Sequence, residues 1–263
     1  MKINVFKFQL TKLQGKLMNA RNLFISLITM FVMAGCTKGP SPNLCASVCD
    51  GLVAYYPFYG NATDKSGNGH DLSVLGPTLS KDRNGYQNHS YLFDGRTTHL
   101  RFAKPLPNLG GGPITVAIWF KVSSFTNPEW IFADQERAFS LSVFQNQVQK
   151  YILNFEIRKN MKTWDRSYLH HEIELNKPYH FTGVVDEENK RMELYINGEI
   201  IKKRYWSERI PFGKNLVIGG NIHDIGKKNF NGLIDEVRIY NRALSADEVQ
   251  ELYLFTSAFP PAE

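Results

Sequence analysis

The sequence predicts an all-β protein, a two-sheet antiparallel β-sandwich with one short C-terminal helix. Two observations support this fold class. Many short runs of apolar and β-branched residues are separated by turn signals, and aromatic residues make up 13% of a chain that also holds 20 glycines. The segment 244–253, in contrast, combines a helix start signal with an apolar face of helical period. The chain carries no internal repeat, which predicts one sandwich domain.

The expected strands follow the chain in order. They are Leu52–Phe58, Ser90–Phe93, Leu100–Phe102, Thr115–Val122, Trp130–Ala133, Phe139–Phe144, Tyr151–Arg158, Tyr179–Val185, Met192–Ile196, Glu199–Lys203, Leu216–Gly219 and Leu233–Tyr240. In 115–122, Val116, Ile118 and Phe120 alternate with other residues, so one side of the strand is expected to face the core. In 151–158 the second face is largely polar, as in a sheet with one wet side. Asn197-Gly198 predicts a type I′ hairpin.

The C-terminal helix has a capping box. Ser245 is expected as the N-cap and Glu248 as its partner at N3. Leu244 is expected to pack on Val249 as a hydrophobic staple. These features predict a helix that starts directly after Ser245.

The net charge of +6 does not indicate a nucleic-acid partner. Residues 1–35 hold five basic residues and no acidic one, and the rest of the chain has 26 basic and 25 acidic side chains. The basicity therefore belongs to the N-terminal leader, and nucleic acid is excluded as a partner.

The leader is typical of exported proteins. An apolar run at 23–35 is too short for a bilayer span and follows a basic region, as in a signal peptide. Met33-Ala34-Gly35-Cys36 resembles the lipobox of bacterial lipoproteins, with Met33 in place of the usual Leu, which implies that Cys36 is lipidated. Residues 1–17 can be a mis-assigned extension, because Met18 also suits a start. The alternative is an uncleaved N-terminal anchor.

Residues 36–49 are expected to form a tether between the membrane and the folded domain. The leader places the domain outside the cytoplasm, where Cys45 and Cys49 are expected to form a disulfide. A zinc site would need two further ligands, and no Cys or His pair follows at a suitable spacing.

Two terminal segments carry a family resemblance. GLIDEVRIYNRALS at 232–245 resembles the closing strand of bacterial laminin G-like domains of the concanavalin A-like lectin/glucanase type. GLVAYYPF at 51–58 and GNATDKSGNG at 60–69 resemble the opening of that family. The resemblance implies a jelly-roll sandwich over residues 50–256, followed by a tail at 257–263, and it fits lectins, hydrolases and adhesion modules alike.

The loop at 60–71 is rich in oxygen ligands that suit calcium. An EF-hand is excluded because its twelfth position would be Leu75 instead of Glu. The resemblance implies a structural calcium held by Asn61, Asp64 and Asp235. Asp235 and Glu236 are adjacent on a strand and are therefore expected to point to opposite faces, with Asp235 toward this loop. The alternative is that Asn61 and Asp64 only cap turns.

The sequence offers no complete catalytic set. Glu172 and Glu174 form a spaced carboxylate pair, but they precede a turn and lack the third carboxylate of the glucanase pattern. His170 and His171 are adjacent, so on a strand they point to opposite faces and do not share a metal easily. The chain is therefore expected to be a non-enzyme.

Binding is the remaining class of function. Trp164 and Arg166 lie in a polar stretch that suits a sugar ring, Trp206 is a second candidate and Trp130 a third. We expect a carbohydrate-binding module on a lipid-anchored protein of the bacterial cell envelope, at either face of the outer membrane. The alternatives are a protein-binding or adhesion module of the periplasm or cell exterior, without sugar affinity, and, last, a glycoside hydrolase.

Overall fold

A computed structural model describes residues 48–258 except 103–105, 107–108, 110, 126–127, 135, 160–165, 210, 212 and 214. The compact unit begins at Val48. The predicted signal peptide, Cys36 and Cys45 lie outside the described residues and stay predictions. Within the described part, no helix is both long and apolar enough to span a bilayer.

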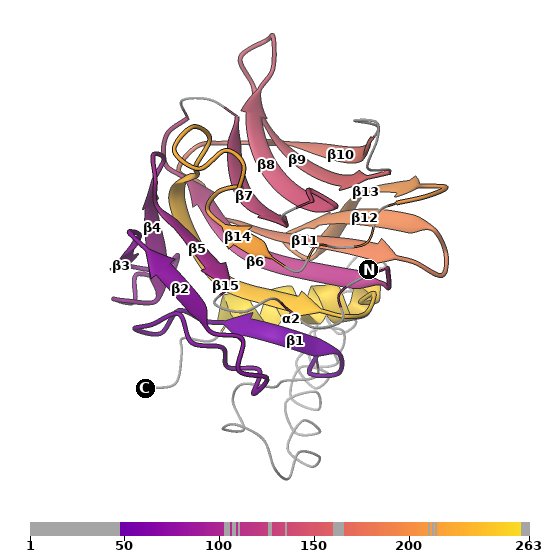
Figure 1. The fold of residues 1–263 in the computed structure, drawn as a ribbon, viewed down its shortest axis with the longest axis horizontal. Helices are drawn as coiled ribbons and strands as arrows, with labels where there is room; N and C mark the ends of the chain where they lie inside the picture. The colour runs from indigo at the N-terminus through magenta and orange to yellow at the C-terminus, as the bar shows by residue number, and fades with distance from the viewer. Residues whose placement is uncertain are drawn as a thin grey trace, which may run out of the picture. The chain divides into compact units, whose positions relative to one another are not determined.

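The unit is a sandwich of two antiparallel sheets, which confirms the predicted fold class (Figure 1). One sheet has eight strands in the order β13-β12-β11-β6-β15-β4-β3, with β1 also paired to β15. Its strands are β1 (Leu52–Tyr56), β3 (Thr78–Ser80), β4 (Ser90–Asp94), β6 (Ile114–Val122), β11 (Tyr179–Asp186), β12 (Arg191–Ile196), β13 (Glu199–Tyr205) and β15 (Asn231–Tyr240).

The other sheet has seven strands in the order β10-β9-β8-β7-β14-β5-β2. Its strands are β2 (Leu72–Leu75), β5 (His99–Phe102), β7 (Glu129–Asp134), β8 (Phe139–Gln145), β9 (Tyr151–Arg158), β10 (Arg166–Ile173) and β14 (Leu216–Ile218). The edge strands β10 and β13 lie at the same side of the sandwich (Figure 1).

The core lies between the sheets. Val116, Ile118 and Phe120 of β6 fill it as predicted, because alternate residues of a strand share a face. The other face of β6 is also buried, since Ala117 packs in a second apolar cluster with Val249 and Leu252 of the C-terminal helix. The eight-stranded sheet is therefore covered on both faces, with the sandwich core on one and the helix on the other.

The helix α2 (Ala246–Ala258) starts where the capping box predicts. The Ser245 backbone N–H donates to Glu248 Oε2 at 2.8 Å, and the Glu248 N–H donates to Ser245 Oγ at 3.3 Å. Leu244 and Val249 share the second cluster, as the staple requires. A hydrogen bond from Arg242 lowers the pKa of Glu248 to about 2, which keeps the box ionised at neutral pH.

Three strands were not predicted. β2 and β3 have four and three residues and partly exposed side chains, so no apolar alternation marks them. In β10, Ser167 and His171 occupy inward positions that an apolar residue would normally hold. The predicted hairpin at Asn197-Gly198 is confirmed, with φ of 52° and 80°.

Candidate binding site on the seven-stranded sheet

The acidic pair of the closing strand lies on one face, so the prediction that Asp235 and Glu236 point to opposite faces is wrong. A bulge interrupts the pairing of β15 with β6 between Asp235 and Arg238, and Glu236 has a left-handed φ of 50°. The extra residue shifts the alternation by one, because a bulge sets two residues opposite one. Ile234 and Val237 face the core, while Asp235, Glu236 and Arg238 face the helix side.

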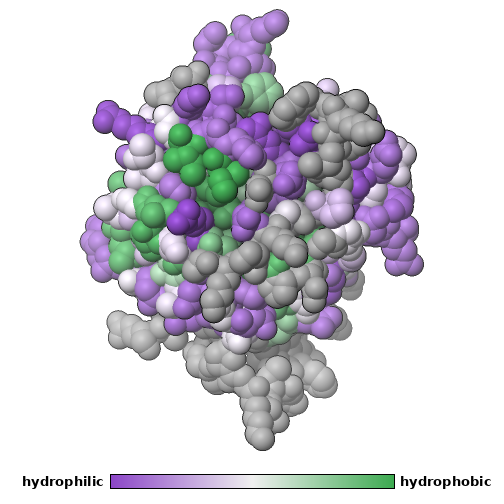
Figure 2. All heavy atoms as spheres, viewed as in Figure 1, coloured by the Kyte–Doolittle hydropathy of each residue, from purple (hydrophilic) through white to green (hydrophobic). Residues whose placement is uncertain are grey.

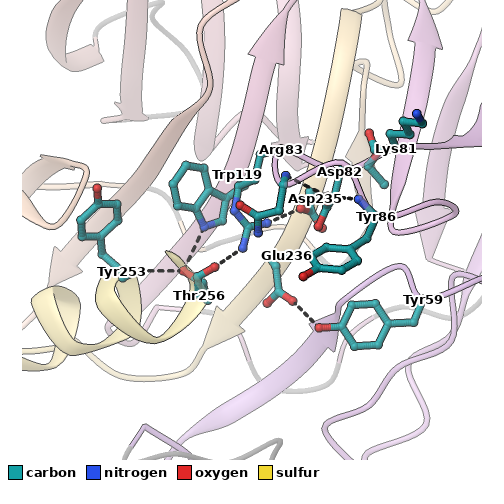
Figure 3. A network of polar contacts seen from close by, with 12 residues as sticks. Tyr59, Lys81, Asp82, Arg83, Tyr86, Trp119, Asp235, Glu236, Tyr253 and Thr256 are labelled. Carbon is teal, nitrogen blue, oxygen red and sulfur yellow. Dashed lines mark hydrogen bonds and ion pairs between the residues drawn. The ribbon is translucent and has the colours of Figure 1, made fainter. Parts of the chain in front are cut away.

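Asp235 belongs to a buried network beneath α2 (Figure 3). Arg83 forms an ion pair with Asp235 and donates to the backbone oxygen of Thr256, and its guanidinium lies 4.4 Å from the ring centroid of Trp119. Trp119 Nε1 donates to Thr256 Oγ1 at 2.9 Å. Burial raises the pKa of Asp235, and the Arg83 charge opposes that shift. The network joins the 81–89 loop, the closing strand and the helix.

Glu236 connects the closing strand to the N-terminal residues of the described chain. Its Oε1 accepts hydrogen bonds from the hydroxyls of Tyr55 at 3.0 Å and Tyr59 at 3.1 Å, and its Oε2 accepts one from Arg238 at 3.2 Å. Burial is the main cause that raises the pKa of Tyr55 and Tyr59. The opening loop therefore meets the closing strand through Tyr59 and Glu236 (Figure 3).

The predicted calcium ligands do not lie as one set. Asp64 accepts the backbone N–H groups of Tyr55, Ser66 and His70 and the Ser66 hydroxyl, and Asn61 Oδ1 accepts from Thr63. Asp235 pairs with Arg83 instead. No group of three His, Cys, Asp or Glu side chains with metal-site geometry occurs among the described residues. The geometry matches turn capping, and Asp235 does not fit a site with the other two.

A different constellation lies on the outer face of the seven-stranded sheet, where β8, β9 and β10 pair. The register puts side chains in cross-strand rows on this face. One row is Tyr168, Glu156 and Ser140, and the next is His170, Asn154, Ser142 and Trp130. Arg166 lies opposite Arg158 at one end of the rows. We call these residues the outer-face site.

The centre of the outer-face site is polar and buried, with Asn154 9% and Glu156 7% exposed. Glu156 forms an ion pair with Arg166 and accepts hydrogen bonds from Ser140 Oγ at 2.8 Å and Asn154 Nδ2 at 3.2 Å. Asn154 Oδ1 and Trp130 Nε1 have no hydrogen-bond partner among the described residues. Buried polar atoms without partners are rare in folded proteins.

The rim of the outer-face site is aromatic. Tyr168 is 47% exposed, and its ring stacks on His170 with centroids 4.8 Å apart and an interplanar angle of 15°. Phe144 packs edge-on to His170 at 5.4 Å. Arg204 of β13 lies 5.2 Å from the Tyr168 ring centroid. An exposed flat ring beside hydrogen-bonding groups is the chemistry that the apolar face and hydroxyls of a sugar need.

Only some of the predicted glycan-binding residues lie in the outer-face site. Arg166 lies in the outer-face site, and Trp164 lies outside the described residues. Trp206 is 6% exposed and packs in the main core, so it presents no open ring. Trp130 is in the site but is largely buried beneath the Arg137 guanidinium, 5.0 Å from its ring centroid. The exposed ring is a tyrosine where a tryptophan was expected.

The carboxylate and histidine candidates for catalysis are dispersed. Glu172 pairs with Lys150 at 2.8 Å and Glu174 with Lys177 at 2.7 Å, both exposed. His170 and His171 point to opposite faces of β10, as expected. A pocket of about 570 Å³ lies beside them, lined by residues that include His171, Tyr179 and Tyr253. The carboxylates that line this pocket are Glu172, Glu174 and Glu199. They lie near the end of β10, just after β10 and at the start of β13.

From the sequence alone, Tyr168 and Glu156 are not predicted as site residues, and His170 is considered only as a metal ligand. Their signal was present, because Tyr168, His170 and Glu172 alternate with Leu169, His171 and Ile173. The alternation is hard to recognise in the sequence, because the inward positions include the polar residues Ser167 and His171. Asn154 and Glu156 were read as a wet face, whereas they are buried.

Comparison with known proteins identifies the family. Residues 94–250 match the concanavalin A-like lectin/glucanases superfamily, in its Laminin_G_3 family. The match covers more than half of the chain, so the chain belongs to this family. A comparison with curated proteins gave no match.

Three solved structures with a similar fold are binding domains. The botulinum neurotoxin serotype D binding domain is 18% identical with a TM-score of 0.63, over 79% of this chain and 52% of that chain. The neurotoxin DC binding domain in complex with rat synaptotagmin II is 18% identical with a TM-score of 0.61 (79% and 52%). The same domain in complex with SialylT is 16% identical with a TM-score of 0.61 (79% and 52%). The chain spans about half the length of these structures, and the likeness shows the jelly-roll fold.

Proposed function

We propose that the chain is a non-catalytic binding module that holds a glycan on the outer-face site. The observation that carries this proposal is the exposed Tyr168 ring at the rim of a polar face of the sheet. The ring would lie under the apolar face of a sugar, and Arg204 beside it would donate hydrogen bonds to the sugar oxygens. Glu156 and Arg166 hold each other and orient Asn154.

The comparisons are consistent with a binding role. The family includes lectins by its description, and the similar solved structures are binding domains. One of those domains is in complex with SialylT and another with rat synaptotagmin II. Both glycan and protein partners are therefore reasonable for the fold, and the outer-face site favours the glycan. A glycan-array screen of the full chain tests the proposal, and an array without any bound glycan would contradict it.

A protein-binding module without sugar affinity is the second candidate. Figure 2 shows hydrophobic residues gathered on one part of the visible face. Ile222 and Ile225, in the loop between β14 and β15, are exposed. Exposed apolar area of this kind suits a protein partner.

We also propose, from the sequence, that the chain is a lipoprotein of the bacterial outer membrane, anchored through Cys36, with a Cys45–Cys49 disulfide. Intact-mass measurement of the purified protein checks both points. A chain that begins at Cys36 with added acyl mass and gains two hydrogens on reduction supports them. An unmodified N-terminus or two free thiols would contradict the corresponding part.

Calcium binding is retained as a proposal for the 60–71 loop alone. Asn61 and Asp64 both lie in it, while Asp235 is committed to Arg83. Thermal unfolding of the full chain with excess calcium and with chelator decides the point. A ligand specific for the folded state at 100 times its Kd adds about 2.7 kcal/mol of stability, and equal midpoints would remove calcium.

A further inference from the structure

Two open sheet edges lie together beside the outer-face site. β10 ends the seven-stranded sheet and β13 ends the eight-stranded sheet, and the two strands are in contact (Figure 1). Lys202 and Arg204 of β13 are paired with Leu194 and Met192, which face the core, so both side chains leave the sheet on the side of β10. Arg204 thereby reaches the Tyr168 ring.

Positive charge surrounds the rim of the site. Lys202 and Arg204 are exposed along β13, and Arg158 and Arg166 stand opposite each other at the end of β9 and the start of β10. The surface at this side of the molecule is hydrophilic (Figure 2). Two described carboxylates on this face are already matched, because Glu156 pairs with Arg166 and Glu172 with Lys150. Among the described residues, Lys202 and Arg204 therefore add exposed positive charge at this rim.

Positive charges also contribute to the pKa shifts of two neighbouring groups. Burial, followed by the charges of Lys202 and Arg204, lowers the pKa of His170. Burial, followed by the charge of Arg137, lowers the pKa of Arg166. An anion placed on this face would relieve the repulsion between these groups.

We propose that the glycan bound at the outer-face site is anionic and carries carboxylate or sulfate groups. The proposal rests on the proposed function. The sugar would contact the exposed part of Tyr168, and its acidic substituent would lie against Lys202 and Arg204, whose guanidinium already lies over that ring. Guanidinium groups suit such substituents because their donors match carboxylate and sulfate oxygens in pairs.

The test uses an array with matched pairs on one sugar core: sulfated against desulfated and sialylated against desialylated glycans, with poly-glutamate as an anion without sugar. The full chain is compared with the double variant Lys202→Gln/Arg204→Gln. The charged member of a pair is expected to bind about tenfold more tightly at low salt, and the double variant to lose that preference. The matched control is Arg96→Gln/Lys227→Gln, which removes two exposed charges elsewhere.

The outcomes separate the two proposals. Equal binding of charged and neutral members overturns the anionic preference and leaves the glycan proposal intact. Poly-glutamate binding as tight as that of the best charged glycan also overturns it, because charge alone would then suffice. Binding of sulfated but not sialylated members identifies sulfate as the recognised group, and the reverse identifies carboxylate. An array with no bound glycan overturns the proposed function and this inference together.

Discussion

Replacing Arg83 with methionine is expected to destabilise the fold by about 3–5 kcal/mol at neutral pH, because it leaves the buried Asp235 carboxylate without its partner. The same change removes the guanidinium from the Trp119 face and the donor to the Thr256 oxygen. The free energy of unfolding from urea denaturation of the full chain is the measurement. A loss of this size corresponds to a large part of the stability of an ordinary domain.

Two matched variants make the Arg83 result interpretable. Lys150→Met breaks the exposed pair with Glu172 and is expected to cost less than about 1 kcal/mol. Arg83→Met/Asp235→Leu removes both buried charges and is expected to recover part of the loss, since an apolar pair can replace a buried ion pair. An Arg83→Met variant within 1 kcal/mol of the parent would show that the ion pair does not hold the helix to the sheet.

The second large effect is on acid stability and comes from His180. Its ring is fully buried between Trp119 and Tyr253, with centroids 5.2 and 5.8 Å away. Burial, followed by the charges of Arg83 and Arg238, lowers its pKa from 6.5 to about 3. Between these two values the unfolded chain binds a proton that the folded chain does not. The contribution of His180 to stability is therefore present above pH 6.5 and falls by up to about 1.4 kcal/mol per pH unit toward pH 3.

His180→Phe removes this titration and keeps a ring of similar shape. At pH 7 its stability is expected to stay within about 1.5 kcal/mol of the parent, and its acid unfolding midpoint to move to lower pH. Urea denaturation at a series of pH values measures both. The control is His223→Gln, an exposed histidine whose loss should leave the midpoint unchanged. Parallel stability curves for the parent and His180→Phe between pH 4 and 7 would contradict the assignment.

The fold could be predicted from sequence where local signals are strong. The alternation of Val116, Ile118 and Phe120 and the capping box of Ser245 and Glu248 depend only on residue spacing, and both are confirmed. The bulge at Glu236 could not be predicted, because nothing in the DEVR segment marks a non-glycine residue for left-handed φ. Because of this bulge, the Glu236 side chain lies on the same face of the sheet as Asp235 and not on the opposite one.

The outer-face site was only partly predictable for a related reason. Arg166 is predicted because it lies beside Trp164 in a polar stretch of sequence. Its ion-pair partner Glu156 lies ten residues away, and only the pairing of β9 with β10 brings the two side chains together. Arg204 reaches Tyr168 from the other sheet, so no local window of sequence contains both. Contacts between strands that are distant in the chain are what a single sequence leaves open.

The most direct test of the account is a glycan array probed with the parent chain, Tyr168→Ala and Tyr86→Ala, followed by titration with the best glycan. Tyr86 is a matched control, since it is 41% exposed and also stacks on a histidine, His89, at 5.9 Å. The parent and Tyr86→Ala are expected to bind alike, and Tyr168→Ala to lose about tenfold or more in affinity. Equal binding by all three proteins would place the glycan elsewhere and contradict the outer-face site.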